Sequence, residues 1–334
     1  MAITIHGSKK RLDAVWWLSF SSSIGLFLVN VSGFVDTETG SALGCGHQWP
    51  LCNDEFIPTL WNEHTLFEFA HRVLVLLIAV FLISTVIAVW HRYGSWLEVR
   101  VLAWISMGFV ILESVIGAIA VLLPTVSPAI LAITLGVSLL SFVGNVLLTV
   151  VLSQIQRRPS FGSEVSLHLR ACEIPPHFMG WSFFTLGYTF LAMYVGAYLA
   201  KSNISDSFRG YPLPSETYHQ VGFNLYFDFL HRGIAIGLFL LIIRLFVPAY
   251  RWRSKRPDLY KGALLAMLLV VGQILSGGFL ILSHLSLLGF LIHVSVVSCL
   301  FATVAYLLLQ SLPEPLRPSP SSTSQTPSKT PSQI

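Results

Sequence analysis

The chain has 334 residues, of which 54% are hydrophobic and 11% are charged. Soluble domains carry about 25% charged residues, so this composition and a mean hydropathy of +0.71 exclude an ordinary soluble protein. The formal net charge of +4 does not indicate nucleic-acid binding, because the basic residues gather in short segments between long apolar runs.

Eight apolar runs are each long enough to cross a bilayer as a helix, which takes about 20 residues. They cover residues 14–35, 66–90, 101–123, 128–152, 177–200, 221–246, 262–283 and 287–310. We therefore expect an all-α membrane protein with eight transmembrane helices.

Lysine and arginine precede the first run and lie between runs 2 and 3, 4 and 5, and 6 and 7, whereas residues 36–64 contain none. Positive residues favour the cytoplasmic side, so we expect both termini to be cytoplasmic and residues 36–64 to lie outside. The first run is too long for a signal peptide and no small-x-small cleavage site follows it. Since no transit segment is visible either, we expect the plasma membrane of a bacterial-type cell.

The outer segment 36–64 contains the stretch GCGHQWPLCND. Cys45 and Cys52 face an oxidising compartment in this topology, which favours a disulfide, structural or redox-active. A metal site formed with His47 is the alternative, although the spacing matches no common zinc pattern.

The second run opens with FEFAHR, which places Glu68 and His71 on one helix face about 5–6 Å apart. Ionisable side chains inside a membrane are unfavourable by about 2.5 kcal/mol or more, so they are functional candidates. A carboxyl one helical turn from a histidine that contacts a bound group can accept or relay a proton, or stabilise positive charge on a reacting carbon. The alternative is that Glu68 pairs with Arg72 or with lipid headgroups.

A shift of 160 residues places His71 on His231, and the neighbouring acids and arginines also coincide, Glu68 on Asp228 and Arg72 on Arg232. The same shift places Glu113 on Gln273 and Gly117 on Gly277. The register predicts two tandem four-helix bundles related by a pseudo-twofold duplication.

The expected organisation has five parts. A cytoplasmic N-terminus covers residues 1–13, the first bundle 14–152, a cytoplasmic linker 153–176, the second bundle 177–310, and a Pro/Ser/Thr-rich tail 311–334. The tail cannot bury a core, so we expect it to be disordered.

His231 and His293 lie at similar depth in the sixth and eighth runs, so we expect them to ligate a haem iron from both sides. The alternative is two separate hydrogen-bonded histidines at helix interfaces. Arg72 and Arg232 follow their histidines directly and point about 100° away from them. They are candidates for pairing with haem propionates, with an ion pair to Glu68 or Asp228, or extension to the membrane interface, as alternatives.

These motifs together resemble the haem A synthase family: TGSALGCGHQWPLC in the outer segment, FEFAHR, FLHR and, in the eighth run, LIHVSV. The resemblance covers about residues 14–310. It implies an oxidoreductase that converts haem O to haem A by oxidising a porphyrin methyl group to formyl, through successive hydroxylations, for cytochrome oxidase. A haem O synthase and an unidentified electron donor are the implied partners, with the lipid bilayer as surroundings.

The resemblance also implies the site. His231 and His293 would ligate haem b, while His71 would contact the substrate haem in the N-terminal half. Glu68 would be the catalytic acid, and Cys45 and Cys52 match loop cysteines that form a disulfide in some members.

The sequence departs from the family at one place, because the fourth run has Ile133 and Thr134 where a second substrate-site histidine is usual. One interpretation is five-coordinate iron with a position open for oxygen chemistry. The other is a haem carrier or b-type cytochrome without synthase activity. His71, His231 and His293 all lie near the outer face, which disfavours electron transfer across the bilayer. A transporter is disfavoured because no charged site lies at mid-membrane.

Overall fold

The computed structural model describes residues 12–123, 127–157, 160–161, 164–165, 170 and 173–313. Residues 1–11 of the predicted N-terminal segment and 314–334 of the predicted tail lie outside the described residues.

The described residues form eight long helices, and all eight are long and apolar enough to cross a membrane, as the sequence predicts. Their bounds are α1 (Ala14–Glu38), α2 (Glu63–Tyr93), α3 (Leu97–Leu122), α4 (Pro128–Gln156), α5 (Phe178–Lys201), α7 (Asn224–Arg251), α8 (Pro257–Leu282) and α9 (Leu287–Ser311).

Several helices extend past the predicted apolar runs because polar residues continue or cap them. Helix α2 begins at Glu63, where the side chain of Asn62 accepts a hydrogen bond from the Thr65 amide. Helix α1 continues to Glu38, three residues beyond the end of its predicted run.

Where the structure describes the connections, they contain four short elements. Between α4 and α5, the strands β1 (Ser160–Phe161) and β2 (Glu164–Val165) pair antiparallel. Between α5 and α7 lie a 3₁₀ turn, η1 (Ser205–Ser207), and the one-turn helix α6 (Tyr218–Val221).

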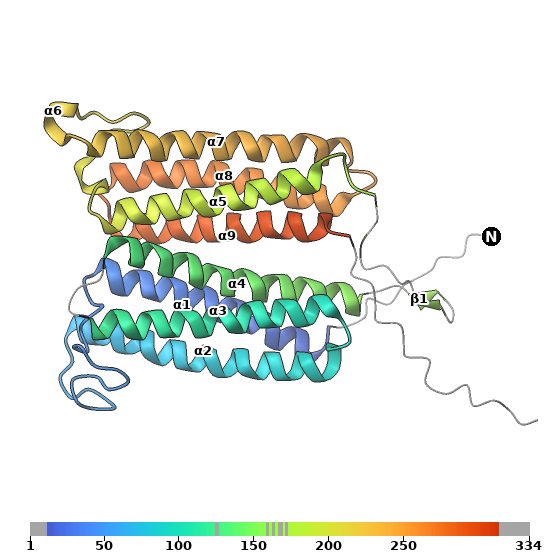
Figure 1. Cartoon of the computed structure of the whole chain (residues 1–334), viewed down its shortest axis with the longest axis horizontal. Coiled ribbons are helices and arrows are strands. Elements are labelled where there is room, and N and C mark those ends of the chain that lie inside the picture. Colours follow the sequence, from blue (N-terminus) through green and yellow to red (C-terminus); the bar gives the residue numbers. More distant parts are fainter. Residues whose placement is uncertain are drawn as a thin grey trace, which may run out of the picture.

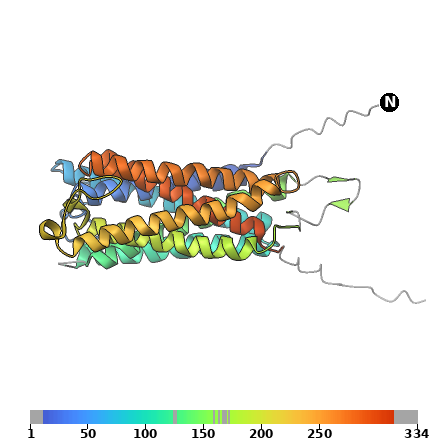
Figure 2. The same cartoon turned by 90° about the horizontal axis from the view of Figure 1, so that it is seen from above.

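The helices form two groups of four, α1–α4 and α5 with α7–α9, which lie side by side in Figure 1 and have their axes roughly parallel in both views (Figure 2). Helices α1 and α4 of the first group contact α5 and α9 of the second. The two groups match the predicted bundles, while their origin by duplication stays a prediction. We call the end that carries residues 39–62 and 202–217 the disulfide end; α1 begins and α9 ends at the opposite end.

An apolar cluster joins the groups, with Leu26, Leu82 and Leu139 from the first packed near Met193 and Phe301 from the second. Small polar residues provide hydrogen bonds between helices inside the first bundle, for example from Asn145 to Ser23 at 2.9 Å. Such bonds and small side chains hold membrane helices together where burial from water provides no driving force.

Candidate functional site

His71 of α2 packs against α1, near the disulfide end. Its Nδ1 lies 2.8 Å from Oγ of Ser32, and Ser32 in turn donates to the carbonyl of Val29 at 2.9 Å. Because that hydroxyl hydrogen is used, Ser32 accepts from Nδ1–H, which leaves Nε2 with its lone pair available to a ligand. A Cβ on Gly33 would lie 3.1 Å from Cε1 of the ring, so this glycine allows the close approach.

His293 of α9 is held in the same way by α8. Its Nδ1 lies 3.0 Å from Oγ of Ser276, which donates to the carbonyl of Gln273 at 2.9 Å. A Cβ on Gly277 would lie 3.3 Å from its Cε1. The amide nitrogen of Gln273 lies 3.0 Å from Nε2 of His293 and therefore caps the nitrogen that a metal would use. The sequence analysis missed these serine–glycine pairs.

His231 of α7 packs against α5, where a Cβ on Gly196 would lie 3.0 Å from its Cε1. Val195 precedes this glycine, so no hydroxyl is present there, and Nδ1 of His231 is buried without a hydrogen-bond partner in the described part of the chain. Helices α7 and α9 both contact α5 and α8, and His231 and His293 lie close enough to interact electrostatically. Because no described residue bonds to Nδ1, no serine fixes the tautomer of His231 as one does for His71 and His293, and a ring nitrogen of His231 is available to a ligand.

Glu68 of α2 is buried and connects the helix to the loop at residues 39–62. Its Oε1 forms an ion pair with Arg72, and its Oε2 accepts from the Cys45 amide at 2.6 Å. Arg72 also donates to the carbonyl of Leu51 at 2.8 Å. The structure thus has the ion pair that the sequence offered as one alternative for Arg72, and roles of Glu68 in catalysis and of Arg72 at a propionate stay predictions.

The loop itself is closed by a disulfide between Cys45 and Cys52, as expected. Its path along α2 requires glycine at Gly44, where a Cβ would lie 2.3 Å from the carbonyl oxygen of His64. His47 bonds instead to the carbonyl of Val121 at 3.0 Å, and the described residues contain no group of three potential metal ligands. The disulfide removes the alternative of a metal site at these cysteines.

The second half repeats the anchoring arrangement. Arg232 pairs with the buried Asp228, with Nε 2.6 Å from Oδ2, and donates to the carbonyls of Gly210 and Pro212 in the loop at residues 202–217. Arg72 and Arg232 therefore each fasten a loop to the helix that carries a histidine. A propionate contact of Arg232 stays a prediction.

Asp36 is a residue that the sequence analysis missed, because the predicted run ended at residue 35. It lies on α1, where it is 6% exposed and interacts electrostatically with Glu68 and Arg72 of α2. Its Oδ1 has no hydrogen-bond partner within the described residues.

Ile133 and Thr134 of α4 occupy the position where the family usually has a second histidine. Thr134 bonds to the carbonyl of Leu131 in its own helix at 2.7 Å, and Ile133 is 47% exposed. A Cβ on Gly117 would meet nothing within 4 Å, whereas its counterpart Gly277 lies against His293. Glu113 has a buried Oε2 without a partner among the residues described.

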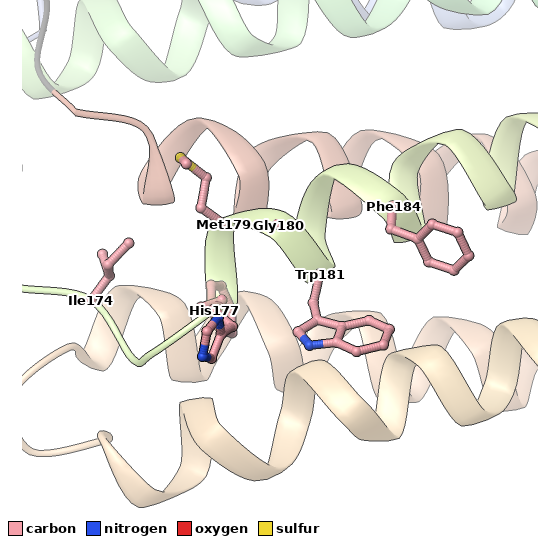
Figure 3. Close-up of a pocket in the computed structure, with 7 residues that line it drawn as sticks. Ile174, His177, Met179, Gly180, Trp181 and Phe184 are labelled. Carbon is pink, nitrogen blue, oxygen red and sulfur yellow. The ribbon is translucent and has the colours of Figure 1, made fainter.

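One cavity in the part of the chain that the structure describes lies away from these residues. It has a volume of about 660 Å³ and an apolar lining at the start of α5, where His177 and Trp181 are shown in Figure 3. Because Gly196, which contacts His231, lies near the other end of α5, this cavity is separate from the candidate site.

Comparison with known proteins gives consistent matches over both bundles. The family model described as "Cytochrome oxidase assembly protein" (COX15-CtaA) matches residues 15–305. A protein of Geobacillus kaustophilus named "Heme A synthase" is 30% identical over 302 residues, which cover 89% of this chain and 91% of that protein. Proteins of the same name from Geobacillus thermodenitrificans and Staphylococcus saprophyticus are each 30% identical, over 90% and 91% of this chain and 93% and 97% of their own lengths.

Proposed function

Because this chain belongs to the haem A synthase family, the COX15-CtaA group of cytochrome oxidase assembly proteins, it acts in haem A biosynthesis, and we propose that it oxidises the methyl group of haem O to formyl. The observation that carries the proposal is the position of two side chains of α2, His71 and Glu68, at the disulfide end of the first bundle. His71 has its Nε2 free, and Glu68 lies one helical turn away on the same face of α2.

In this proposal the first bundle binds the substrate. His71 is held by Ser32 in one tautomer and faces the substrate haem with Nε2, without a second histidine opposite. Glu68 provides a buried carboxyl that accepts or returns protons beside the reacting carbon. Arg72 balances the charge of Glu68, while its bond to Leu51 and the bond from Cys45 to Glu68 keep the loop over this end of the bundle.

The second bundle would hold haem b, with His231 and His293 as the residues that bind it. The placement of His231 and His293 on two helices of one bundle and the serine-fixed tautomer of His293 support this assignment, provided that Gln273 moves off Nε2 of His293. When bound, haem b would supply one-electron chemistry. The residues of this chain would fix the rings and exclude water from the bundle.

Gly196 gives a test of the haem b site that changes neither histidine. We expect Gly196→Val to lower the haem b content per chain several-fold, because a Cβ there already meets the His231 ring at 3.0 Å and must displace it. Gly180→Val on the same helix is the control, since a Cβ at Gly180 meets nothing within 4 Å. The measurement is the haem absorbance per purified chain, and equal haem content in both variants would contradict the assignment.

The topology follows the distribution of basic residues. We propose that the disulfide end faces the outside of a bacterial-type plasma membrane and that both termini are cytoplasmic. An oxidising compartment at this end is consistent with the bond between Cys45 and Cys52. A haem O synthase is the proposed source of the substrate. An electron donor is also proposed, because each hydroxylation by O2 takes two electrons to reduce the second oxygen atom to water.

The function is tested by expressing the chain with a haem O synthase in a cell that makes no haem A, followed by extraction and chromatography of the haems. Haem A is the expected product, and its absence with properly inserted protein would overturn the proposal. A haem carrier, the alternative function, would leave haem O unchanged in this experiment. Family membership disfavours the carrier.

A further inference from the structure

The substrate end of the first bundle contains two buried carboxyls and one guanidinium. Glu68 and Arg72 belong to α2, which runs antiparallel to α1 and touches it where Ser32 bonds to His71. Asp36 comes four residues after Ser32 and Glu68 three residues before His71, so both carboxyls lie about one helical turn from this contact, toward the disulfide end. Glu68 is 2% exposed and Asp36 6%. If both carboxyls were ionised, the three side chains together would carry one uncompensated negative charge inside the membrane protein.

The hydrogen bonds divide these carboxyls into two kinds. Glu68 accepts from Nε and Nη2 of Arg72 and from the Cys45 amide, so donors surround its negative charge. The remaining terminal nitrogen of Arg72, Nη1, is directed to the carbonyl of Leu51. Asp36 receives no hydrogen bond at Oδ1 from any residue that the structure describes.

The other charged groups near this end have partners of their own. Lys201 of α5 pairs with Glu38 and bonds to Thr37 at 3.0 Å, and His71 is bonded to Ser32. Helices α4 and α9 also pack on α1. The first half of α4 contains no charged residue between positions 128 and 144, and α9 contains no Asp, Glu, Lys or Arg. Glu68 and Arg72 are therefore the charged groups that act on Asp36.

A buried carboxylate without hydrogen-bond donors is unstable, and it becomes neutral by taking up a proton. We propose that Asp36 and Glu68 form a carboxyl pair that holds one proton, that the proton rests on Asp36, and that this pair is the proton store of the substrate site. The ionised partner is Glu68, which keeps the three donors already directed at it.

The role in the reaction rests on the proposed function. Asp36 is four residues from Ser32, which holds His71, and Glu68 is three residues from His71, so the pair lies one helical turn from the imidazole that would face the substrate. For Glu68 to act as a proton donor, the Asp36 hydroxyl first passes its proton to the Glu68 carboxylate, and Glu68 then gives that proton up beside the reacting carbon. Both carboxyls are then ionised next to Arg72, and one proton taken up from the aqueous phase returns the pair to its resting state.

The pair is a feature of the first bundle. Gly33 contacts His71 as Gly196 contacts His231. Three residues after Gly33 the chain has Asp36, whereas three residues after Gly196 it has Leu199. The second carboxyl is thus placed in the bundle assigned to the substrate, not in the one assigned to haem b.

The test compares Asp36→Asn with Glu38→Gln in the full-length protein. Glu38 lies two residues away on the same helix and has a cation as partner, so it is a matched control. The first readout is the infrared carbonyl band of protonated carboxyl groups at neutral pH, which identifies neutral acids without any reaction. Because Glu113 also has a buried oxygen without a partner, Glu113→Gln is measured to assign its band. We expect Asp36→Asn to lose one band that the Glu38 and Glu113 variants retain.

The second readout is the melting temperature. A neutral Asp36 without hydrogen bonds loses nothing on replacement by asparagine, so we expect an unchanged or raised melting temperature. A band that persists together with a lowered melting temperature would mean that Asp36 is ionised and supports Arg72, and would overturn the proposal.

The third readout is the rate of haem A formation, which we expect Asp36→Asn to lower about 10²-fold, the lower range for a positioned proton donor. A parental rate in Asp36→Asn would overturn its part in the reaction even where the band is lost. If the unmodified protein makes no haem A, the proposed function fails, and the infrared and melting results still decide whether the proton is present.

Discussion

Glu68→Gln should lower haem A formation by about 10²- to 10⁴-fold, the usual contribution of a positioned acid or base. Glutamine has nearly the same shape and still accepts a hydrogen bond from the Cys45 amide, but it carries neither a charge nor an exchangeable acid proton. The haem b spectrum should be unchanged, because His231 and His293 belong to the other bundle. The measurement is the ratio of haem A to haem O in extracts from cells that supply haem O.

Glu68 also anchors the loop, so a loss of activity has two possible causes that must be separated. Limited proteolysis of residues 39–62 reports whether the loop has been released, and Glu38→Gln, which removes a carboxyl from an ion pair at the same end, is the control. An intact loop with lost activity is the expected result. Haem A formation at the parental rate in Glu68→Gln would show that this carboxyl is an anchor alone.

His231→Ala and His293→Ala should each abolish the low-spin, bis-histidine absorption bands of haem b, because one remaining imidazole cannot fill both axial positions. The side-chain packing predicts a difference between the two variants. Removal of the His293 side chain leaves Ser276 and Gln273 without their hydrogen-bond partner. Removal of the His231 side chain breaks no such bond, because its Nδ1 has no partner in the described chain. We therefore expect the haem-free form of His293→Ala to lose more thermal stability than that of His231→Ala.

The control for this pair is Gln273→Leu, which removes the amide that caps Nε2 of His293. If His293 binds iron through that nitrogen, Gln273→Leu should retain or increase haem b. Bis-histidine bands that survive in either alanine variant would show that another residue supplies the axial ligand.

Much of the fold was predictable because the membrane imposes a simple pattern. Long apolar runs predict the eight helices, and the described helices fall on all eight. The ends of the helices were less predictable, since polar residues continue a helix where side chains cap it or meet other polar groups. Asp36 illustrates the consequence, because hydropathy assigned it to a loop although α1 continues for two residues beyond it.

The histidines and acids of the site were also predictable, because ionisable residues are conspicuous within apolar runs. Their partners were not predictable, since they come from other helices. Ser32 and Ser276 read as ordinary small residues in a membrane helix until packing places each beside an imidazole. The same holds for Arg72 and Arg232, whose bonds to loop carbonyls depend on how the loops fold back on the bundles.

The central claim is that the two bundles bind different haems, a substrate in the first and haem b in the second. The most direct measurement is the identity and amount of haem in protein purified from cells that make haem O. We predict one haem b and one haem O or haem A per chain, with His71→Ala losing the second and keeping the first. A chain that carries haem b alone, with a haem content that does not respond to His71→Ala, would contradict the account.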